Sequence, residues 1–379
     1  MAKILLIIDS LGSGGAQRQL VTIARGLKAR GHEVTFFTYF PQYDHFLGWL
    51  REVNIPVVSQ PKKGSLGISV FWRLYRLIKQ ERFDGAMAFM QSPSLYLEMA
   101  VALIPRRQRP RVVFSDRTTF AEDFRPSFGF ILRQQLHRYC DVITANSHAH
   151  CDKLQSMFPW MKQKLLPVYN GIEPSVAQGQ GQAPIDKPYL LSVSRVIGYK
   201  NFQRFADAML RCFETFGDVP TVIWVGRVFP IPEVEKAVAE IQQRFEQRGI
   251  ADRLQFVGEQ SDVARYYQHA SALVHPSRLE GFSNAVVEGM MAGLPLLLGN
   301  ISDHQRIVQT YQNGWIFDVD NTDSMVDALR HFQTCDAQTL QHMASNSHEA
   351  AVALFSFDKA TEQYEALLTG QSGELCSER

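Results

Sequence analysis

The sequence lacks any long hydrophobic run free of charge. Of its 379 residues, 45% are hydrophobic and 20% are charged, yet no apolar stretch approaches the roughly 18 residues of a membrane-spanning helix. At the amino terminus, MAKILLIIDSLGSGG holds one short apolar run, and Asp9 with a glycine-rich loop follows where a signal peptide would have small residues for cleavage. These features predict a cytoplasmic protein whose first apolar run is a β-strand.

Cysteine is scarce, and its pattern favours a reducing compartment. The five cysteines are odd in number and lack the spacing of metal ligands, which suits the cytosol. The cluster SHAHC, from Ser147 to Cys151, sets two histidines beside a cysteine, but no second group of ligands accompanies it. We interpret it as the start of a helix and not as a metal site.

An excess of charge of one sign is also missing, since the formal net charge is only +1 at pH 7. This balance hides an asymmetry: residues 1–175 carry 23 lysines and arginines against 13 aspartates and glutamates, and the remainder carries 16 against 25. The positive excess lies largely in Lys62–Lys63, residues 71–83 and residues 106–111. A basic front half suits an anionic membrane surface. No nucleic-acid partner is expected.

Residues 71–83, FWRLYRLIKQERF, combine an apolar stripe with basic residues. Phe71, Leu74, Tyr75 and Ile78 recur at helical spacing, with arginines and a lysine interleaved. Such a helix either lies on an anionic membrane, or packs its stripe against the domain core and leaves its basic residues in water. The sequence leaves both interpretations open.

Ten short apolar runs alternate with helical patterns along the chain. They are KILLIID, EVTFFTY, GAMAFM, RVVFSD and VITANS in the front half, and YLLSVS, TVIWVG, LQFVG, SALVHPS and PLLLGN behind. Runs of this kind, separated by helices, are typical of parallel strands that are covered on both faces. Because a domain has roughly 100 to 200 residues, the chain predicts two doubly wound α/β domains. We place them at residues 1–174 and 188–356, joined by a polar, glycine-rich linker at 175–187.

Ligands of this fold bind at the carboxyl ends of the strands, so function is expected in the loops that follow strands. After the first strand, Gly12, Gly14 and Gly15 would let the backbone approach a ligand. A helix from about Ala16 would then offer free N–H groups to an anion. Gln17 stands where a dinucleotide fingerprint has its third glycine, so the loop does not predict a nicotinamide cofactor. A tight turn without a ligand is the alternative.

A second loop, RVIGYKN, places Arg195 and Lys200 directly after a strand, with Gly198 between them. Two cations in one loop can neutralise a diphosphate, the arginine by a fork of donors and the lysine as a point charge. The alternative is a pair of solvated basic residues beside a turn.

A third stretch is HPSRLEGFSNAVVEGMMAGLP. Ser283 would cap a helix that starts at Asn284, with Glu280 in the loop before it and Glu288 about one turn inside. The backbone N–H groups of Phe282, Ser283 and Asn284 would face an anion, while the carboxylates accept hydrogen bonds from hydroxyls. A site for both phosphate and hydroxyls suits a nucleotide sugar. Two exposed charges, one on a loop and one on a helix, are the alternative.

Together these stretches resemble the family 4 glycosyltransferases. HPSRLEGFSNAVVEGMMAGLP is similar to the family's E-x7-E region, with Glu280 and Glu288 in the two glutamate positions, and SVSRVIGYKN resembles its loop with an arginine and a lysine. LGSGGAQRQL resembles its glycine loop, and VYNGIE and YQNGWIFDVDNTDSMVDAL match two further segments in the same order. The resemblance implies an α/β GT-B fold, with two facing, doubly wound Rossmann-like domains and a cleft between them. A C-terminal helix at about 357–370 would pack back on the first domain.

The resemblance also implies roles for particular residues. Arg195 and Lys200 would bind the diphosphate of the donor, Glu288 the nucleotide ribose, and Glu280 the transferred sugar near its reacting carbon. The implied catalytic residues are Glu280, Arg195 and Lys200, and the implied donor-binding residues are Gly14, Gly15, Arg195, Lys200, Glu280, Phe282, Ser283, Asn284 and Glu288.

Two positions depart from the family's pattern. Asp116 and Arg117, in FSDRTTF, stand in a loop where many members have a histidine near the donor sugar, so this loop is a candidate acceptor or active-site loop without an assigned base. Gln17 replaces a common glutamate. The sequence DVD at 318–320 formally matches a metal-binding D-x-D, but it lies where the family has an ordinary acidic loop. We expect no metal and no other cofactor.

The sequence therefore predicts a retaining glycosyltransferase. Its donor is expected to be a nucleotide-diphosphate sugar, with UDP favoured, bound mainly by the second domain. Its acceptor is expected to be a glycan or lipid-linked glycan, as in the synthesis of bacterial cell-surface polysaccharide or glycolipid. The protein is expected to be cytoplasmic, and the sequence leaves open whether its basic first domain lies on the inner face of the cell membrane. The alternatives are a nucleotide-sugar 2-epimerase of related fold and a catalytically inactive sugar-nucleotide-binding protein.

Overall fold

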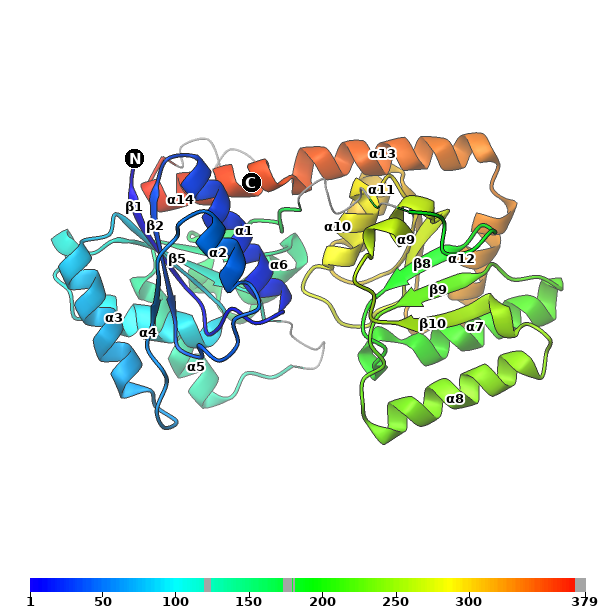
Figure 1. Cartoon of the computed structure of the whole chain (residues 1–379), viewed down its shortest axis with the longest axis horizontal. Helices are drawn as coiled ribbons and strands as arrows, with labels where there is room; N and C mark the ends of the chain where they lie inside the picture. The colour runs from blue at the N-terminus through cyan, green and yellow to red at the C-terminus, as the bar shows by residue number, and fades with distance from the viewer. Residues whose placement is uncertain (119–123, 173–178, 180, 372–379) are drawn as a thin grey trace. The chain divides into compact units, whose positions relative to one another are not determined.

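The computed structural model describes residues 1–118, 124–172, 179 and 181–371. It divides into two compact units. The first unit comprises Met1–Gly171 and the C-terminal segment from Phe357, and the second comprises Ile172–Ser356. Each unit contains a sheet of parallel strands flanked by helices, as the sequence predicts (Figure 1).

The division near the middle of the chain falls at Gly171, where the sequence placed the end of the first domain at 174. Part of the expected linker at 175–187 lies outside the described residues, namely 175–178 and 180. Its described remainder belongs to the second unit, in which His269 Nε2 lies 3.2 Å from the carbonyl oxygen of Gly181.

The sheet of the first unit has the strand order β3-β2-β1-β4-β5-β6-β7. Its strands are β1 (Lys3–Ile7), β2 (Glu33–Thr38), β3 (Val57–Ser59), β4 (Gly85–Phe89), β5 (Arg111–Asp116), β6 (Val142–Ala145) and β7 (Leu165–Pro167). Its helices are α1 (Gly15–Ala29), α2 (Leu47–Glu52), α3 (Ile68–Glu81), α4 (Gln91–Ala102), α5 (Phe128–Gln134), α6 (His148–Met157) and α14 (Phe357–Thr369), with 3₁₀ turns η1 (Arg106–Gln108), η2 (Gln135–Tyr139) and η3 (Pro159–Met161).

Side chains of β1 alternate between two cores, one on each face of the sheet. Ile4 and Leu6 belong to the same buried cluster as Leu20 of α1. Leu5 belongs to the opposite cluster, with Leu74 of α3. Because both faces are covered, the strand reads as a continuous apolar run in the sequence.

The last helix, α14, belongs to the first unit and packs against α1. Gly26 of α1 allows this close approach, since a Cβ atom there would lie 2.5 Å from Thr361 Oγ1. At the end of α1, Arg30 Nη1 and His32 Nε2 lie 3.0 and 2.7 Å from the two carboxylate oxygens of Glu365. The segment that the resemblance assigned to the first domain is this helix.

The sheet of the second unit has the order β10-β9-β8-β11-β12-β13. Its strands are β8 (Leu190–Val193), β9 (Val222–Val225), β10 (Leu254–Gly258), β11 (Ala272–His275), β12 (Leu296–Gly299) and β13 (Gly314–Phe317). Its helices are α7 (Phe202–Phe216), α8 (Pro232–Glu246), α9 (Ala264–His269), α10 (Asn284–Met291), α11 (His304–Tyr311), α12 (Thr322–Thr334) and α13 (Ala337–Phe355), with turns η5 (Gly198–Lys200) and η6 (Ala251–Arg253). Trp224 and Phe205 are among the largest side chains of its buried core.

All ten predicted strands are present, and the sequence missed three more. These are β3, β7 and β13, which stand at the edges of their sheets. Most of their residues are only partly buried. An edge strand has one unpaired side and less cover, so its apolar run is easier to miss, although the edge strand β10 was recognised from LQFVG.

Helix α3 contains the basic amphipathic segment. Leu74 and Ile78 of the predicted stripe are buried in the core, whereas Phe71 and Tyr75 are only partly buried. The interleaved arginines and lysine are exposed. The stripe therefore faces the core, and this helix presents its basic side chains to its surroundings together with the exposed Ile68 and Trp72. Among the residues that the structure describes, no helix combines the length and hydropathy needed to cross a membrane.

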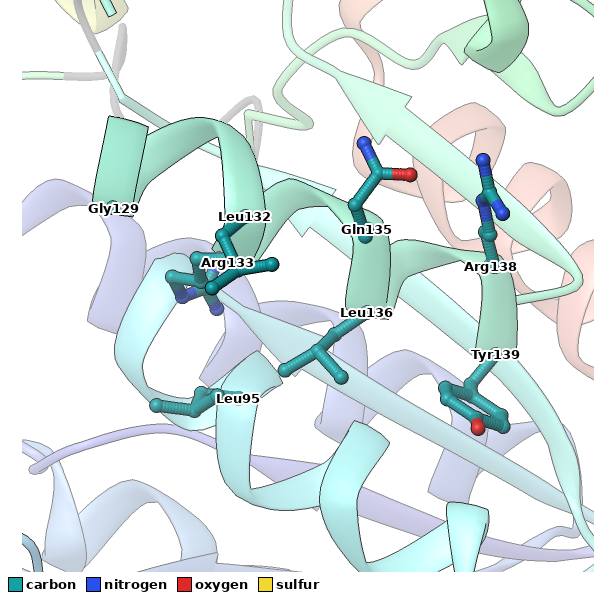
Figure 2. A pocket seen from close by; sticks show the side chains of 8 residues that line it. All are labelled: Leu95, Gly129, Leu132, Arg133, Gln135, Leu136, Arg138 and Tyr139. Carbon is teal, nitrogen blue, oxygen red and sulfur yellow. The ribbon is translucent and has the colours of Figure 1, made fainter. Parts of the chain in front are cut away.

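An apolar groove of about 580 Å³ lies between α4 and the segment formed by α5 and η2 (Figure 2). Leu95 on α4 lies opposite Leu136 on η2, and Leu132 on α5 continues the wall. Tyr139, the last residue of η2, closes one end.

Candidate active site

The carboxyl edge of the second sheet brings two of the predicted site residues together. β8 is bonded on one side to β9 and on the other to β11, so the strand order reverses there. Open α/β sheets bind ligands at such a switch point, because the loops on either side turn in opposite directions. Lys200 ends η5, after β8, and Glu280 lies in the loop between β11 and α10.

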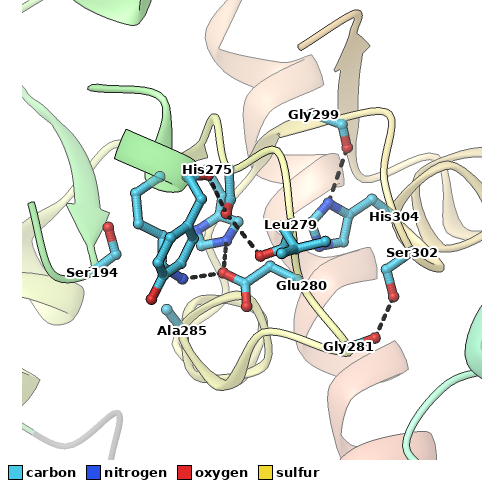
Figure 3. A network of polar contacts seen from close by, with 12 residues as sticks. Ser194, His275, Leu279, Glu280, Gly281, Ala285, Gly299, Ser302 and His304 are labelled. Carbon is cyan, nitrogen blue, oxygen red and sulfur yellow. Dashed lines mark hydrogen bonds and ion pairs between the residues drawn. The ribbon is translucent and has the colours of Figure 1, made fainter. Parts of the chain in front are cut away.

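Glu280 and Lys200 form an ion pair through Glu280 Oε1, and His275 Nε2 lies 3.1 Å from the same oxygen. Figure 3 shows His275 and Glu280 facing each other across the start of the loop. The side chains of Lys200 and Glu280 are only 13% and 15% exposed, so water screens the pair weakly. Across the described part of the chain, Glu280 Oε2 has no protein donor, which leaves it available to a hydroxyl.

Glu280 is ionised at neutral pH because its partners outweigh its burial. Burial raises the pKa of this carboxyl, but the hydrogen bond from His275 and the charge of Lys200 lower it from 4.5 to about 2. A carboxylate that stays ionised is a strong acceptor for sugar hydroxyls.

Two buried histidines stand behind Glu280. The ring centroids of His275 and His304 are 5.8 Å apart, in an edge-to-face arrangement (Figure 3). Burial lowers the pKa of both rings, that of His304 to about 4, so both are neutral at pH 7. His304 Nδ1 lies 3.0 Å from the carbonyl oxygen of Gly299 and must carry the proton, and His275 Nε2 donates to Glu280 in the same way.

Hydrogen bonds between loops fix the positions of Lys200 and Glu280. The backbone nitrogen of Arg278 donates to the carbonyl of Tyr199 at 2.9 Å, which ties the loop after β11 to the turn after β8. Ser302 Oγ, from the loop after β12, donates to the carbonyl of Gly281 at 2.5 Å. The site is therefore held by three neighbouring strands before any ligand binds.

Arg195 lies in the same loop as Lys200 but does not join the ion pair. Its side chain is exposed, and Nη2 donates to the hydroxyl of Tyr199 at 2.7 Å. Among the described residues it has no carboxylate partner. The two cations that the sequence treated alike thus differ, since one is neutralised by Glu280 and the other is not.

The start of α10 differs from the sequence prediction in one detail. The helix begins at Asn284 after Ser283, as predicted, but the Ser283 side chain makes no capping hydrogen bond. Phe282 is buried and packs on Phe355, with ring centroids 5.2 Å apart. The anchoring of this turn comes from an aromatic contact, which the sequence pattern does not reveal.

Glu288 is buried in α10, where its Oε2 accepts a hydrogen bond from the hydroxyl of Tyr267 at 2.9 Å. Tyr267 lies on α9 and is itself fully buried. The sequence placed Glu288 one turn into the helix but gave no sign of this tyrosine. Its hydrogen bond holds the carboxylate in one orientation, as a ligand contact requires.

The glycine loop of the first unit ends at the amino terminus of α1. Gly14 is the residue before the helix and, having no side chain, makes no capping hydrogen bond. Gln17 Nε2 donates to Asp9 Oδ1 at 3.0 Å, and a Cβ atom at Gly14 would lie 2.2 Å from Gln17 Oε1. A glutamate at 17 would set two carboxylates against each other, so glutamine suits the neighbouring Asp9.

Arg117 is held by contacts within the first unit. Its Nε donates to Ser115 Oγ at 3.0 Å and its Nη2 to the hydroxyl of Tyr364, on α14, at 2.9 Å. Nη1 contacts Asn170, and the guanidinium lies 4.3 Å from the ring centroid of Phe89. The side chain is thus held rigidly. Its part in an active site stays a prediction, and residues 119–123 of the same loop lie outside the described residues.

Asp116 is fully buried and accepts hydrogen bonds from Gln91 Nε2 at 2.9 Å and the backbone nitrogen of Thr118 at 2.8 Å. His150 of α6 was missed as a neighbour. Burial lowers the pKa of His150, and the charges of Asp116 and Arg117 act on it as well. His150 belongs to the motif SHAHC, which the sequence analysis interpreted only as the start of a helix.

Both aspartates of the D-x-D sequence at 318–320 have protein partners. Asp320 Oδ1 lies 2.6 Å from Arg204 Nη1 and also contacts Arg278. Asp318 Oδ1 accepts from the backbone nitrogen of Asp320 at 2.8 Å. These contacts show an acidic loop paired with arginines.

Elsewhere in the described residues, Glu98, His137 and Cys140 form the one group whose ligand atoms lie close enough to hold a metal. Ser94, His137 and Cys140 all contact Glu98 Oε1, the sulfur at 3.3 Å. The three contacts converge on one oxygen of this buried carboxylate, whereas Glu98 Oε2 and His137 Nε2 are buried without a hydrogen-bond partner among the described residues.

Two family models match consecutive parts of the chain. Residues 13–176 match Glycosyltransferase Family 4, and residues 177–350 match Glycosyl transferases group 1. Two Rossmann-like units matched in this order define a glycosyltransferase of the GT-B class. The chain belongs to glycosyltransferase family 4.

Two distant relatives span most of the chain. The chain is 21% identical to the N-acetyl-alpha-D-glucosaminyl L-malate synthase of Bacillus anthracis, over 93% of each protein. It is 23% identical to a Campylobacter jejuni enzyme, over 87% of this chain and 90% of that one: N-acetylgalactosamine-N,N'-diacetylbacillosaminyl-diphospho-undecaprenol 4-alpha-N-acetylgalactosaminyltransferase. Among solved structures, Anabaena HepE in complex with UDP and glucose has a TM-score of 0.78 at 19% identity, covering 97% of this chain and 100% of that one. This likeness shows the shared fold.

Proposed function

We propose that the protein transfers a hexosyl or N-acetylhexosaminyl group from a nucleotide-diphosphate sugar, with UDP favoured, to a glycan or lipid-linked glycan acceptor. The group formed by Lys200, Glu280 and His275 carries this proposal. It sets a cation suited to phosphate beside an ionised carboxylate suited to hydroxyls, at the switch point of a sheet. A nucleotide sugar presents both chemical groups at the bond that breaks.

The proposed reaction retains the anomeric configuration. As the bond between the sugar carbon and the phosphate oxygen breaks, the sugar becomes oxocarbenium-like and negative charge grows on the diphosphate. Arg195 and Lys200 stabilise that charge, while Glu280 holds a sugar hydroxyl and Glu288 holds the ribose. The acceptor oxygen attacks the same face of the sugar, and its proton passes to the leaving phosphate.

Catalysis is proposed to need no metal ion. Arg195, Lys200 and the backbone N–H groups at the start of α10 can supply the positive charge that a cation would give to the leaving group. Chelation by EDTA should leave the rate of transfer unchanged. Loss of activity on chelation, with recovery on adding magnesium or manganese ions, would contradict this part of the proposal.

The relatives support the choice of donor and acceptor. The HepE crystals contain UDP and glucose, which supports a UDP-sugar as donor. The name of the C. jejuni relative specifies a sugar acceptor linked to diphospho-undecaprenol, which supports a lipid-linked glycan. We therefore propose a role in bacterial cell-surface polysaccharide, lipopolysaccharide or glycolipid synthesis.

We also propose that the first unit binds the inner face of the cell membrane. Its α3 presents arginines and a lysine outward, and each basic residue near an anionic surface contributes about 1 kcal/mol. Binding to anionic vesicles should weaken steeply with salt, because the Debye length is about 10 Å at 0.1 M. Flotation without lipid association at low salt would overturn this proposal.

The test of the main proposal screens nucleotide sugars in two assays. A donor present at 100 times its dissociation constant should stabilise the protein by about 2.7 kcal/mol, seen as a rise in the unfolding temperature. The protecting donor should then lose its sugar only when an acceptor is added. Release of an epimerised nucleotide sugar without acceptor would indicate a 2-epimerase, and protection without any turnover would indicate an inactive binding protein.

A further inference from the structure

A second pocket, of about 490 Å³, lies at the edge of the first sheet that is opposite to the carboxyl ends of its strands. Arg111 begins β5, Asp141 directly precedes β6 and Lys164 directly precedes β7, so the pocket is at the amino ends of these strands. The glycine loop and the loop with Asp116 lie at the carboxyl ends of strands in the same sheet. This basic pocket is therefore separate from the loops to which sugar transfer is assigned.

The pocket gathers five cations beside a single carboxylate. Its lining includes one carboxylate, that of Asp141, which accepts a hydrogen bond from the backbone nitrogen of Val112 at 2.8 Å. Its cations are Arg106, Arg109, Arg111, Arg138 and Lys164. In the described part of the chain, none of them forms an ion pair with a carboxylate. Cations crowded in this way repel one another, and an anion bound among them relieves the repulsion.

Backbone carbonyls hold three of these cations in place. Arg109 donates to two carbonyls near the end of α4, the shorter at 2.7 Å. Arg111 Nε donates to the carbonyl of Leu367 at 2.6 Å, and Lys164 Nζ to that of Cys140 at 2.7 Å. A carbonyl fixes a cation without cancelling its charge. Capping of helix ends accounts for Arg109, Arg111 and Lys164, but it does not account for Arg106 and Arg138 at the same place.

The basic pocket borders the apolar groove of Figure 2. Arg138 and Tyr139 line both, and the groove leads away between Leu95 and Leu136. Large apolar side chains near its rim are in contact with water, among them Leu132, which is 61% exposed. A polar end with positive charge and an apolar groove beside it match a ligand with an anionic head and a hydrocarbon chain.

We propose that the basic pocket and the groove form a binding site for one class of membrane lipid, with a phosphomonoester or diphosphate head in the pocket and the first part of its chain in the groove. Arginine forks suit such a head, because its terminal oxygens accept paired hydrogen bonds. The inference rests on the proposed membrane association and names the headgroup that the first unit selects. This site differs from the basic face of α3, which would attract any lipid with a negatively charged headgroup.

The experiment compares two kinds of vesicle of equal surface charge, one containing phosphatidic acid and the other phosphatidylserine. The native protein should bind the vesicles with the exposed phosphomonoester at least tenfold more tightly. The double variant R106E/R138E should lose this preference, and Leu132→Glu should reduce it. A control variant of α3, R73E/R76E, should weaken binding to both vesicles alike and keep the preference.

Three results would overturn the lipid site. One is that R106E/R138E keeps the full preference for phosphatidic acid vesicles while its unfolding temperature equals that of the native protein. Another is that inorganic phosphate protects the native protein but not R106E/R138E against unfolding, while the native protein shows no preference between the two vesicles. That result would show a site for a free anion. The third is absence of binding to either vesicle. Sugar transfer to a water-soluble acceptor, measured without vesicles, should be native in all three variants, and its absence in the native protein would count against the proposed function instead.

Discussion

Replacing Lys200 by methionine tests whether one ion pair organises the donor site. Lys200 and Glu280 are 13% and 15% exposed, so the change leaves a largely desolvated carboxylate that keeps only the hydrogen bond from His275. Breaking a buried pair by removing one partner is strongly destabilising, because the remaining charge has lost its compensation. We expect Lys200→Met to destabilise the second unit far more than the loss of an exposed lysine.

The magnitude follows from the pKa of Glu280. A fall from 4.5 to about 2 corresponds to about 3 kcal/mol of stabilisation of the carboxylate, at ~1.36 kcal/mol for each pKa unit. His275 supplies part of this by its hydrogen bond. We therefore assign about 1–2 kcal/mol to Lys200, and expect the unfolding free energy to fall by that amount at neutral pH.

The loss of unfolding free energy in Lys200→Met should depend on pH in a definite direction. The folded pKa of Glu280 lies below its ordinary value, so its contribution to stability is present above about pH 4.5 and is lost as the pH falls toward 2. In Lys200→Met, burial without the cation raises the pKa of Glu280. The carboxyl then takes up a proton at a higher pH, so the difference between variant and native protein should narrow as the solution is acidified.

Urea unfolding followed by circular dichroism from about pH 7 to pH 3 measures this difference. The matched control is Lys236→Met on α8 of the same unit, whose ion pair with Glu240 spans 3.7 Å between residues 78% and 59% exposed. An exposed pair of this kind contributes less than about 0.5 kcal/mol. Equal effects of the two variants, or a loss at Lys200 that does not change with pH, would refute the reasoning.

Three further predictions concern single carboxylates and an amide. Glu280→Gln should lower kcat by about 100-fold while changing donor affinity little, because its contact matters most in the transition state; steady-state kinetics would contradict this if only KM rose. Glu288→Gln should raise the donor KM about tenfold at similar kcat, and unchanged affinity in calorimetry would remove it from the ribose site. Gln17→Glu should lower stability by about 1 kcal/mol through repulsion by Asp9, and an unfolding temperature equal to that of native protein would show that the two do not interact.

The sequence predicts the strands and the loops after them because burial on both faces leaves a continuous apolar run. β8 and β11 are of this kind, and Lys200 and Glu280 follow them at a separation of 80 residues. Adjacent parallel strands bring their carboxyl ends together, so the order of strands in the fold accounts for the meeting of these two residues. A pairing across that distance was therefore within reach of sequence reasoning.

Sequence reasoning could not identify the side chains that orient the site residues. His275 is the last residue of a buried strand, and nothing in its pattern shows that its ring turns toward Glu280. Arg117 finds the hydroxyl of Tyr364, 247 residues away, only because α14 returns to the first sheet. Such contacts depend on how helices pack against a sheet, and helix packing leaves no periodic signal at a single polar position.

The ion pair also separates the roles of the two cations that the sequence placed together. Lys200 is neutralised by Glu280, so a diphosphate can bind it only by taking the place of a carboxylate, which exchanges one anion for another at little net electrostatic gain. In the proposed complex, Arg195 would give up only a neutral hydroxyl partner and would contribute its full charge to the diphosphate. Binding energy should therefore come mainly from Arg195. Displacement of Lys200 toward the phosphate would free Glu280 Oε1 for the sugar, and would thus link recognition of the nucleotide to orientation of the group that is transferred.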